Sequence, residues 1–227
     1  MIKKHLIIFD WDGTIENSIS LIVASIKKSA RTMGLHEPRD NNIRDVIGLN
    51  LPNAIQILFP NLEMIERDSL ISLYRFYYKT AQTREWRLFK NVEGTLRMMK
   101  KKKYLLAIAT GKSRPGLDSS LQLTGLSELV DASRTADETA SKPDPQMIVE
   151  LIKELNIAPT NALMVGDSQY DLEMANNASI ACIGVTYGVH DKSILSKRSP
   201  IGCADDFQEI LLLVDRHFDD KTKKYLS

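Results

Sequence analysis

Short apolar runs in this sequence end abruptly in charged or hydroxyl residues, at places far apart along the chain. Leu6–Phe9 is followed by two aspartates, whereas Leu105–Ala109 and Leu163–Val165 are followed by Thr-Gly-Lys and Gly-Asp. Continuous apolar runs of this length are typical of strands buried on both faces of a parallel sheet. Because the carboxyl ends of parallel strands open onto one crevice, where ligands bind, we expect these polar residues to lie close together.

After about Val92, strand and helix patterns alternate along the chain, which indicates an α/β fold. Cys182–Val185 is a further expected strand. Pro145–Leu155 is an expected helix, because its apolar residues share one face at helical spacing. Asp144 can cap this helix, and Pro145 suits its first turn.

An all-helical segment interrupts the alternation directly after the first expected strand. From Glu16 to about Glu85 the apolar residues follow helical spacing, with no convincing strand. We therefore predict an α/β fold with a Rossmann-like parallel-sheet core, residues 1–16 and 85–227, and an inserted helical domain, residues 17–84. The alternative is a set of peripheral helices packed on the same core.

Composition and charge exclude some functions. The 227 residues include 30 Lys and Arg against 29 Asp and Glu, for a net charge of +1, so no global field favours nucleic acid or an anionic membrane. The two cysteines lack metal-ligand spacing, and no apolar run approaches the ~20 residues of a membrane span. The basic start of the chain lacks a signal-peptide cleavage pattern. We expect a cytoplasmic enzyme.

Asp10 and Asp12 are the first candidates for chemistry. Two carboxylates so close repel each other, and burying both requires a cation or a proton, which a metal ion could supply. Taken alone, the same residues could form a simple acidic turn. The calcium loop of an EF-hand is excluded, because that loop needs an acidic or amide residue where Thr14 stands and glycine where Ile15 stands.

Four motifs occur along the chain: DWDGT, ATGKS, SKPDP and GDSQYD. Together and in this order they resemble the motifs of the haloacid dehalogenase superfamily of phosphotransferases, and the phosphoglycolate-phosphatase-like branch is most similar. The resemblance spans Asp10 to Asp171. It implies a mobile helical cap, inserted after the first motif, that excludes water and selects the substrate.

The resemblance also implies roles for the aspartates. Asp10 would be the nucleophile that forms an aspartyl-phosphate, and Asp12 would protonate the leaving oxygen and then activate water. Mg²⁺ would be held by the Asp10 carboxylate, the backbone carbonyl of Asp12 and Asp167. Asp171, expected near the start of a helix, would reach a metal-bound water or favour the helix N-terminus electrostatically.

The phosphate group is expected to contact the Thr110 hydroxyl, the backbone at Gly111 and the Lys142 ammonium. A P-loop is excluded, because Leu106 stands where that motif needs glycine. In the helical segment, Arg44 is a candidate for binding a second anionic group of the substrate. A solvated helix arginine is the alternative.

These observations predict a magnesium-dependent phosphatase whose ligand is a small phosphorylated metabolite, with 2-phosphoglycolate as one candidate. A phosphomutase similar to β-phosphoglucomutase would use the same motifs. A non-enzymatic phospho-accepting receiver would also combine Asp, Thr and Lys around magnesium. Asp12 disfavours a dehalogenase, whose chemistry lacks the acid/base aspartate and the metal.

Overall fold

Six parallel strands form the sheet in the computed structural model, which describes residues 4–81 and 88–224. The strands are β1 (Leu6–Phe9), β2 (Leu105–Thr110), β3 (Ala132–Thr135), β4 (Ala162–Gly166), β5 (Ala181–Val185) and β6 (Gly202–Ala204). Their order in the sheet is β3-β2-β1-β4-β5-β6. The chain therefore fills the sheet outward from β1 in one direction and then in the other. In such sheets the crevice at the carboxyl ends of the two strands at the reversal, here β1 and β4, is where ligands bind.

Strand side chains alternate between two hydrophobic clusters, one on each face of the sheet. In β1, Ile7 and Phe9 belong to one cluster, and Leu6 and Ile8 belong to the other. The first face is covered by α5 (Val92–Lys101), α6 (Arg114–Thr124) and α10 (Phe207–Lys224). The second face is covered by α7 (Gln146–Glu154) and α8 (Gln169–Asn177). The remaining short elements are η1 (Ser127–Leu129), η2 (Pro159–Asn161), α9 (Lys192–Leu195) and η3 (Ser196–Arg198). The α/β fold expected from the alternating pattern is thus confirmed.

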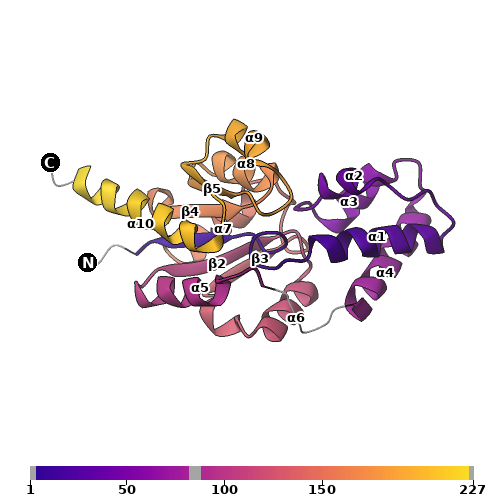
Figure 1. Cartoon of the computed structure of the whole chain (residues 1–227), viewed down its shortest axis with the longest axis horizontal. Helices are drawn as coiled ribbons and strands as arrows, with labels where there is room; N and C mark the ends of the chain where they lie inside the picture. The colour runs from indigo at the N-terminus through magenta and orange to yellow at the C-terminus, as the bar shows by residue number, and fades with distance from the viewer. Residues whose placement is uncertain (1–3, 82–87, 225–227) are drawn as a thin grey trace.

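Between β1 and α5, the described residues form four helices that extend beyond the end of the sheet, at the right of Figure 1. They are α1 (Ile19–Thr32), α2 (Asp40–Arg44), α3 (Leu51–Leu58) and α4 (Met64–Ala81), and with their loops they are called the cap below. The cap has its own hydrophobic cluster, which includes Ile26, Ile55 and Leu70. The boundary expected at residues 84–85 lies outside the described residues, so the domain division at residues 17–84 stays a prediction.

The four strands predicted from apolar runs all form, with bounds that agree to within a residue. The sequence pattern does not reveal β3 and β6, which lie at the two edges of the sheet. An edge strand pairs on one side only and does not need a continuous apolar run, and β3 reads Ala-Ser-Arg-Thr. The expected helix at Pro145–Leu155 is α7, and Oδ1 of Asp144 accepts a hydrogen bond from the Gln146 N–H at 2.9 Å.

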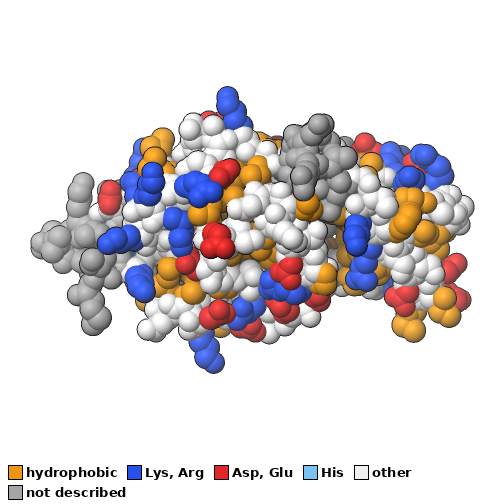
Figure 2. All heavy atoms as spheres, turned by 90° about the horizontal axis from the view of Figure 1, so that it is seen from below, with side chains coloured by type: hydrophobic (Ala, Val, Ile, Leu, Met, Phe, Trp, Pro, Cys, Tyr) orange, Lys and Arg blue, Asp and Glu red, His pale blue; other side chains and the backbone are white. Residues whose placement is uncertain are grey.

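The surface agrees with the balanced composition. On the face shown in Figure 2, Lys and Arg side chains are interspersed with Asp and Glu, so this face carries no continuous field of one sign. Among the described residues, no helix combines the length and the apolar character that a membrane crossing requires.

Candidate active site

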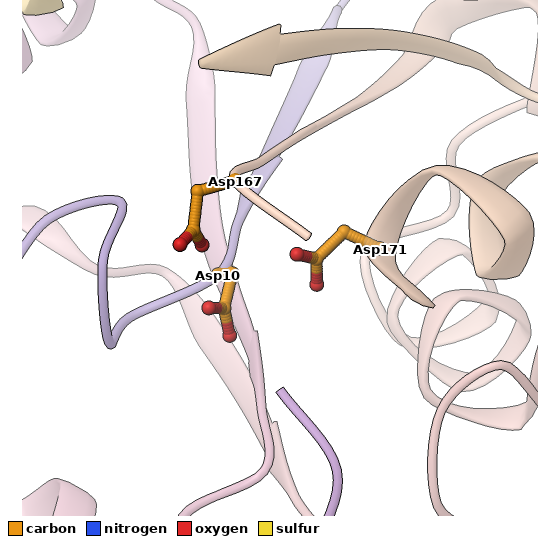
Figure 3. Close-up of side chains that lie close together, drawn as sticks. All are labelled: Asp10, Asp167 and Asp171. Atoms are coloured by element: carbon orange, nitrogen blue, oxygen red, sulfur yellow. The ribbon is translucent and has the colours of Figure 1, made fainter. Parts of the chain in front are cut away.

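Three aspartates meet at the carboxyl ends of β1 and β4 (Figure 3). Asp10 follows β1, Asp167 follows β4, and Asp171 lies in the first turn of α8. One carboxylate oxygen of each lies within 4.8 Å of the others, and all three side chains are buried. Three buried carboxylates repel one another strongly, so this cluster requires positive charge or protons.

Lys142 supplies part of that positive charge. Its Nζ lies 2.5 Å from Oδ1 of Asp10 and 2.6 Å from Oδ1 of Asp171, and the side chain is fully buried. Burial alone would lower the pKa of Lys142, but the negative charges of Asp10 and Asp171 outweigh it and raise the pKa above its usual value. Lys142 pairs with two of the three carboxylates, so negative charge in the cluster remains to be balanced.

Asp10 carries part of the negative charge that remains unbalanced. Its Oδ2 is buried and has no hydrogen-bond partner among the described residues. Burial raises the pKa of Asp10 to about 7, although the charge of Lys142 acts in the opposite direction. Burial likewise raises the pKa of Asp167, and the charge of Asp10 adds to this effect. An unpartnered carboxylate oxygen beside a second carboxylate is a donor set that suits a hard divalent cation such as Mg²⁺.

Asp167 is fixed in place by its own partners. Its Oδ1 accepts a hydrogen bond from the Thr14 hydroxyl at 3.0 Å, and its Oδ2 accepts one from the Val189 N–H at 2.8 Å. Gly13, at φ +85°, and Gly188 leave room for this carboxylate, since a Cβ at either position would collide with it. The position of Asp167 is therefore set by backbone segments on both sides.

Asp171 connects the cluster to the start of α8. Its Oδ2 accepts hydrogen bonds from the N–H and the hydroxyl of Ser168, at 3.0 and 2.6 Å. The Ser168 hydroxyl accepts a hydrogen bond from the Asp171 N–H at 3.3 Å, which completes a capping box. One carboxylate thus starts the helix through one oxygen and binds Lys142 through the other.

Asp12 makes a separate set of contacts. Its Oδ1 accepts a hydrogen bond from the Ser18 hydroxyl at 2.5 Å and lies 2.9 Å from Nζ of Lys112. Lys112 also donates to the Tyr78 hydroxyl at 2.9 Å, and its Nζ lies 3.6 Å from Oε2 of Glu16. Because Tyr78 lies on α4, a single ammonium connects Asp12 to the cap.

The sequence alone predicts no role for Lys112, although it follows Gly111 in the ATGKS motif. Burial opposes its charged form, but the carboxylate of Asp12 and its other partners outweigh this and raise the pKa of Lys112 above its usual value. The sequence feature that could have indicated a role for Lys112 is its position just after the end of β2. Tyr78 is 34 residues away along the chain, so no local pattern could pair the two.

The expected phosphate-binding segment lies against the cap. Thr110 is fully buried at the end of β2, and its hydroxyl accepts a hydrogen bond from the Lys112 N–H at 3.2 Å. A Cβ on Gly111 would lie 2.6 Å from the carbonyl oxygen of Leu49 and 2.8 Å from that of Gly48. Glycine at this position therefore permits the close approach of the loop that precedes α3.

A pocket of about 490 Å³ is lined by both the core and the cap. Asp10, Asp12 and Lys112 line it from the core. Arg44 is half-buried and is not among the described residues that line this pocket. Of the cap residues that the structure describes, the cations that line it are Arg75 and Lys79 on α4.

Two other polar residues near the motifs have structural partners. His190 is buried, its Nδ1 accepts a hydrogen bond from the Gln169 N–H at 3.0 Å, and burial lowers its pKa. Arg114 forms ion pairs with Glu138 at 2.7 Å and with Asp118 at 3.4 Å. These contacts hold loops and helix ends together.

Comparison with known proteins places this geometry in context. Residues 7–185 match the sequence model of the haloacid dehalogenase-like hydrolases. IndB of Dickeya dadantii, named as a probable phosphatase, is 32% identical over 212 residues, which are 92% of each chain. The pyrophosphatase PpaX of Bacillus anthracis is 26% identical over 93% of this chain and 97% of its own. A solved structure from Haemophilus somnus, described as a predicted phosphoglycolate phosphatase, is 28% identical with a TM-score of 0.85, over 94% of this chain and 99% of its own.

Proposed function

We propose that this chain, which belongs to the haloacid dehalogenase-like hydrolase family, is a magnesium-dependent phosphatase that hydrolyses an organic phosphomonoester through an aspartyl-phosphate on Asp10. The observation that carries the proposal is the Asp10 carboxylate. One of its oxygens is bound by Lys142, the other is buried with no hydrogen-bond partner in the described part of the chain, and the residue lines the pocket. A nucleophile at phosphorus requires this combination of fixed orientation and a free oxygen.

In the first step, a carboxylate oxygen of Asp10 attacks phosphorus and the bond to the leaving oxygen breaks. Asp12 gives its proton to that oxygen. In the second step, Asp12 takes a proton from water, the water oxygen attacks phosphorus, and the carboxylate of Asp10 is restored. Splitting the displacement in this way replaces one difficult reaction with two easier ones.

The surrounding residues position these two groups. Lys142 orients the nucleophilic carboxylate and, with the Thr110 hydroxyl and the backbone at Gly111, binds the phosphate oxygens. Lys112 and Ser18 hold the carboxylate of Asp12 at the pocket wall. We assign Lys112 as a positioning residue, because it acts on Asp12 and is held in turn by the cap.

Magnesium would be held by the carboxylates of Asp10 and Asp167 and the backbone carbonyl of Asp12, and it would neutralise charge on these groups and on the phosphate. Asp171 shares the cluster but already binds Lys142 and the start of α8. We therefore assign it the role of holding Lys142 beside the nucleophile.

The direct test measures phosphate release from aryl and alkyl phosphates by the purified full chain, before and after removal of metal ions. We expect activity with Mg²⁺, loss on chelation and recovery on adding Mg²⁺. Acid-quenched samples should contain a phosphorylated peptide that includes Asp10. Full activity in metal-free buffer, or a phosphopeptide elsewhere, would contradict the proposal.

The same assay separates the two alternatives. Isomerisation of a sugar phosphate without release of inorganic phosphate would favour a phosphomutase. A phosphorylated Asp10 that accumulates in the unmodified protein and does not turn over would favour a receiver. A phosphatase releases inorganic phosphate continuously, with the phosphorylated form at low steady-state occupancy.

A further inference from the structure

The pocket beside Asp10 and Asp12 is large for a small leaving group. Its volume of about 490 Å³ falls within the ~300–1,000 Å³ typical of sites that hold ligands of drug size. A second phosphate or a two-carbon acid would leave most of this space unfilled. The pocket therefore accommodates a leaving group at least as large as an aromatic ring.

The cap side of the pocket is mainly apolar. The aliphatic side chains that line it include Ile22, Ile26, Val46, Leu49, Leu51 and Ala54. An apolar leaving group would remove this surface from water, which is favourable. A charged group placed against the same surface would lose hydration without gaining a partner.

Aromatic side chains add a second feature to the same wall. Tyr74 and Tyr78 lie one turn apart on α4, with ring centroids 5.7 Å apart and an angle of 30° between the rings, and both line the pocket. The Tyr78 hydroxyl is held by Lys112, which fixes the orientation of that ring. Such surfaces suit contact with a further ring.

Among the described residues that line the pocket, positive charge for a second anion is limited. The Lys112 ammonium already lies beside the carboxylates of Asp12 and Glu16, at 2.9 and 3.6 Å. Arg75 and Lys79 are exposed, so water already hydrates their charges. The inner part of the pocket therefore favours an uncharged leaving group.

We propose that the preferred substrate is a phosphomonoester whose leaving group is a mainly apolar group of about the size of an aromatic ring, in contact with Tyr74 and the aliphatic wall of the cap. This inference rests on the proposed phosphatase function and specifies its substrate class. It sets the enzyme apart from catalysts whose leaving group is a second phosphate or a short acid.

The test compares 2-phenylethyl phosphate with ethyl phosphate. Both release a primary alcohol of similar basicity, so a difference in kcat/KM reports the binding of the ring and not leaving-group reactivity. We expect kcat/KM to be at least roughly tenfold higher for 2-phenylethyl phosphate, which corresponds to ~1.4 kcal/mol of additional binding. Inorganic pyrophosphate and 2-phosphoglycolate, assayed alongside, should be poorer substrates than 2-phenylethyl phosphate.

Two tyrosine variants provide a matched pair. Tyr74→Ala removes a ring from the pocket wall and should bring the ratio of the two kcat/KM values close to one. Tyr77→Ala removes a neighbouring ring that contacts Thr32 and Lys28 and does not line the pocket, so it should preserve the ratio. If Tyr74→Ala does not fold, Leu51→Ala alters the same wall and should lower the ratio.

The outcomes distinguish this inference from the proposed function. Equal kcat/KM values for the two alkyl phosphates, in an active enzyme, would overturn the inference and leave the phosphatase proposal intact. A preference for pyrophosphate or 2-phosphoglycolate would also overturn it and would assign Arg75 and Lys79 to a second anion. Inactivity on every phosphomonoester would defeat the proposed function itself.

Discussion

The ammonium of Lys112 lies 2.9 Å from Oδ1 of Asp12 and also donates a hydrogen bond to the Tyr78 hydroxyl of the cap at 2.9 Å. The proposed acid/base residue and the cap therefore share one partner. A displacement of α4 that withdraws Tyr78 also removes one of the contacts that hold Lys112 against Asp12. Chemistry at Asp12 is thereby connected to the position of the cap.

The first prediction concerns this contact. Lys112→Met should lower kcat for alkyl phosphates by roughly tenfold to a hundredfold, because Asp12 loses its positioning partner. The loss should be smaller for an aryl phosphate, whose leaving oxygen needs little protonation. Tyr78→Phe, which keeps the ring and removes the hydroxyl, should show a weaker form of the same pattern. Equal losses for both substrate types would argue that Lys112 binds phosphate instead.

Replacement of the nucleophile Asp10 should abolish catalysis without destabilising the fold. Asp10→Asn should lower kcat by at least roughly 10³-fold, since an amide does not attack phosphorus. Its melting temperature in metal-free buffer at pH 8 should not fall below that of the unmodified protein, because the substitution removes a buried charge that burial disfavours. Residual activity of a few per cent in a folded, pure preparation would speak against the aspartyl-phosphate.

Asp12→Asn should fail at a different step. With an aryl phosphate the phosphorylated enzyme should still form, but its hydrolysis should stall for want of a base. Rapid-mixing experiments should show a burst of phenol near one equivalent, followed by a much slower steady state. If burst and steady state disappear together, Asp12 is not the group that activates water.

Magnesium binding should depend on pH in a defined direction. Burial raises the pKa of Asp10 from its ordinary value of 3.8 to about 7, so a proton competes with the metal below pH 7. A carboxyl group with a raised pKa in the folded state costs stability as the pH rises through that value, and a cation relieves this cost. The increase in melting temperature on adding Mg²⁺ should be larger at pH 8 than at pH 6. An equal increase at both pH values would exclude Asp10 as a ligand.

Arg44 should contribute little to substrate choice. It is not among the described residues that line the pocket, in contrast to Arg75 and Lys79. Arg44→Ala should leave kcat/KM within about twofold for each phosphomonoester of a panel, as expected for a surface substitution away from the site. A changed ranking of the substrates would restore the expectation that Arg44 meets a second anionic group.

Local sequence pattern predicts the central strands because each is buried on both faces and reads as an apolar run. It does not predict β3 and β6, whose edge positions remove that requirement. The same limit applies to the site. Asp10 and Asp167 could be proposed from motifs at strand ends, and Lys142 from the SKPDP motif, which lies between β3 and α7. The structure places all three in one cluster. Lys112 contacts Tyr78 where α4 meets the core. The two residues are far apart in the sequence, so a pattern of neighbouring residues cannot predict this contact.

Asp171 has a consequence for any attempt to redesign this enzyme. The carboxylate that starts α8 through Ser168 also holds Lys142 beside Asp10. A substitution that keeps the helix start but removes the charge deprives Lys142 of a counter-charge, and a substitution that shifts the helix displaces that lysine. Stability and catalytic power therefore cannot be adjusted independently at this position. Engineering of the substrate range should begin in the cap, where side chains line the pocket without supporting the sheet.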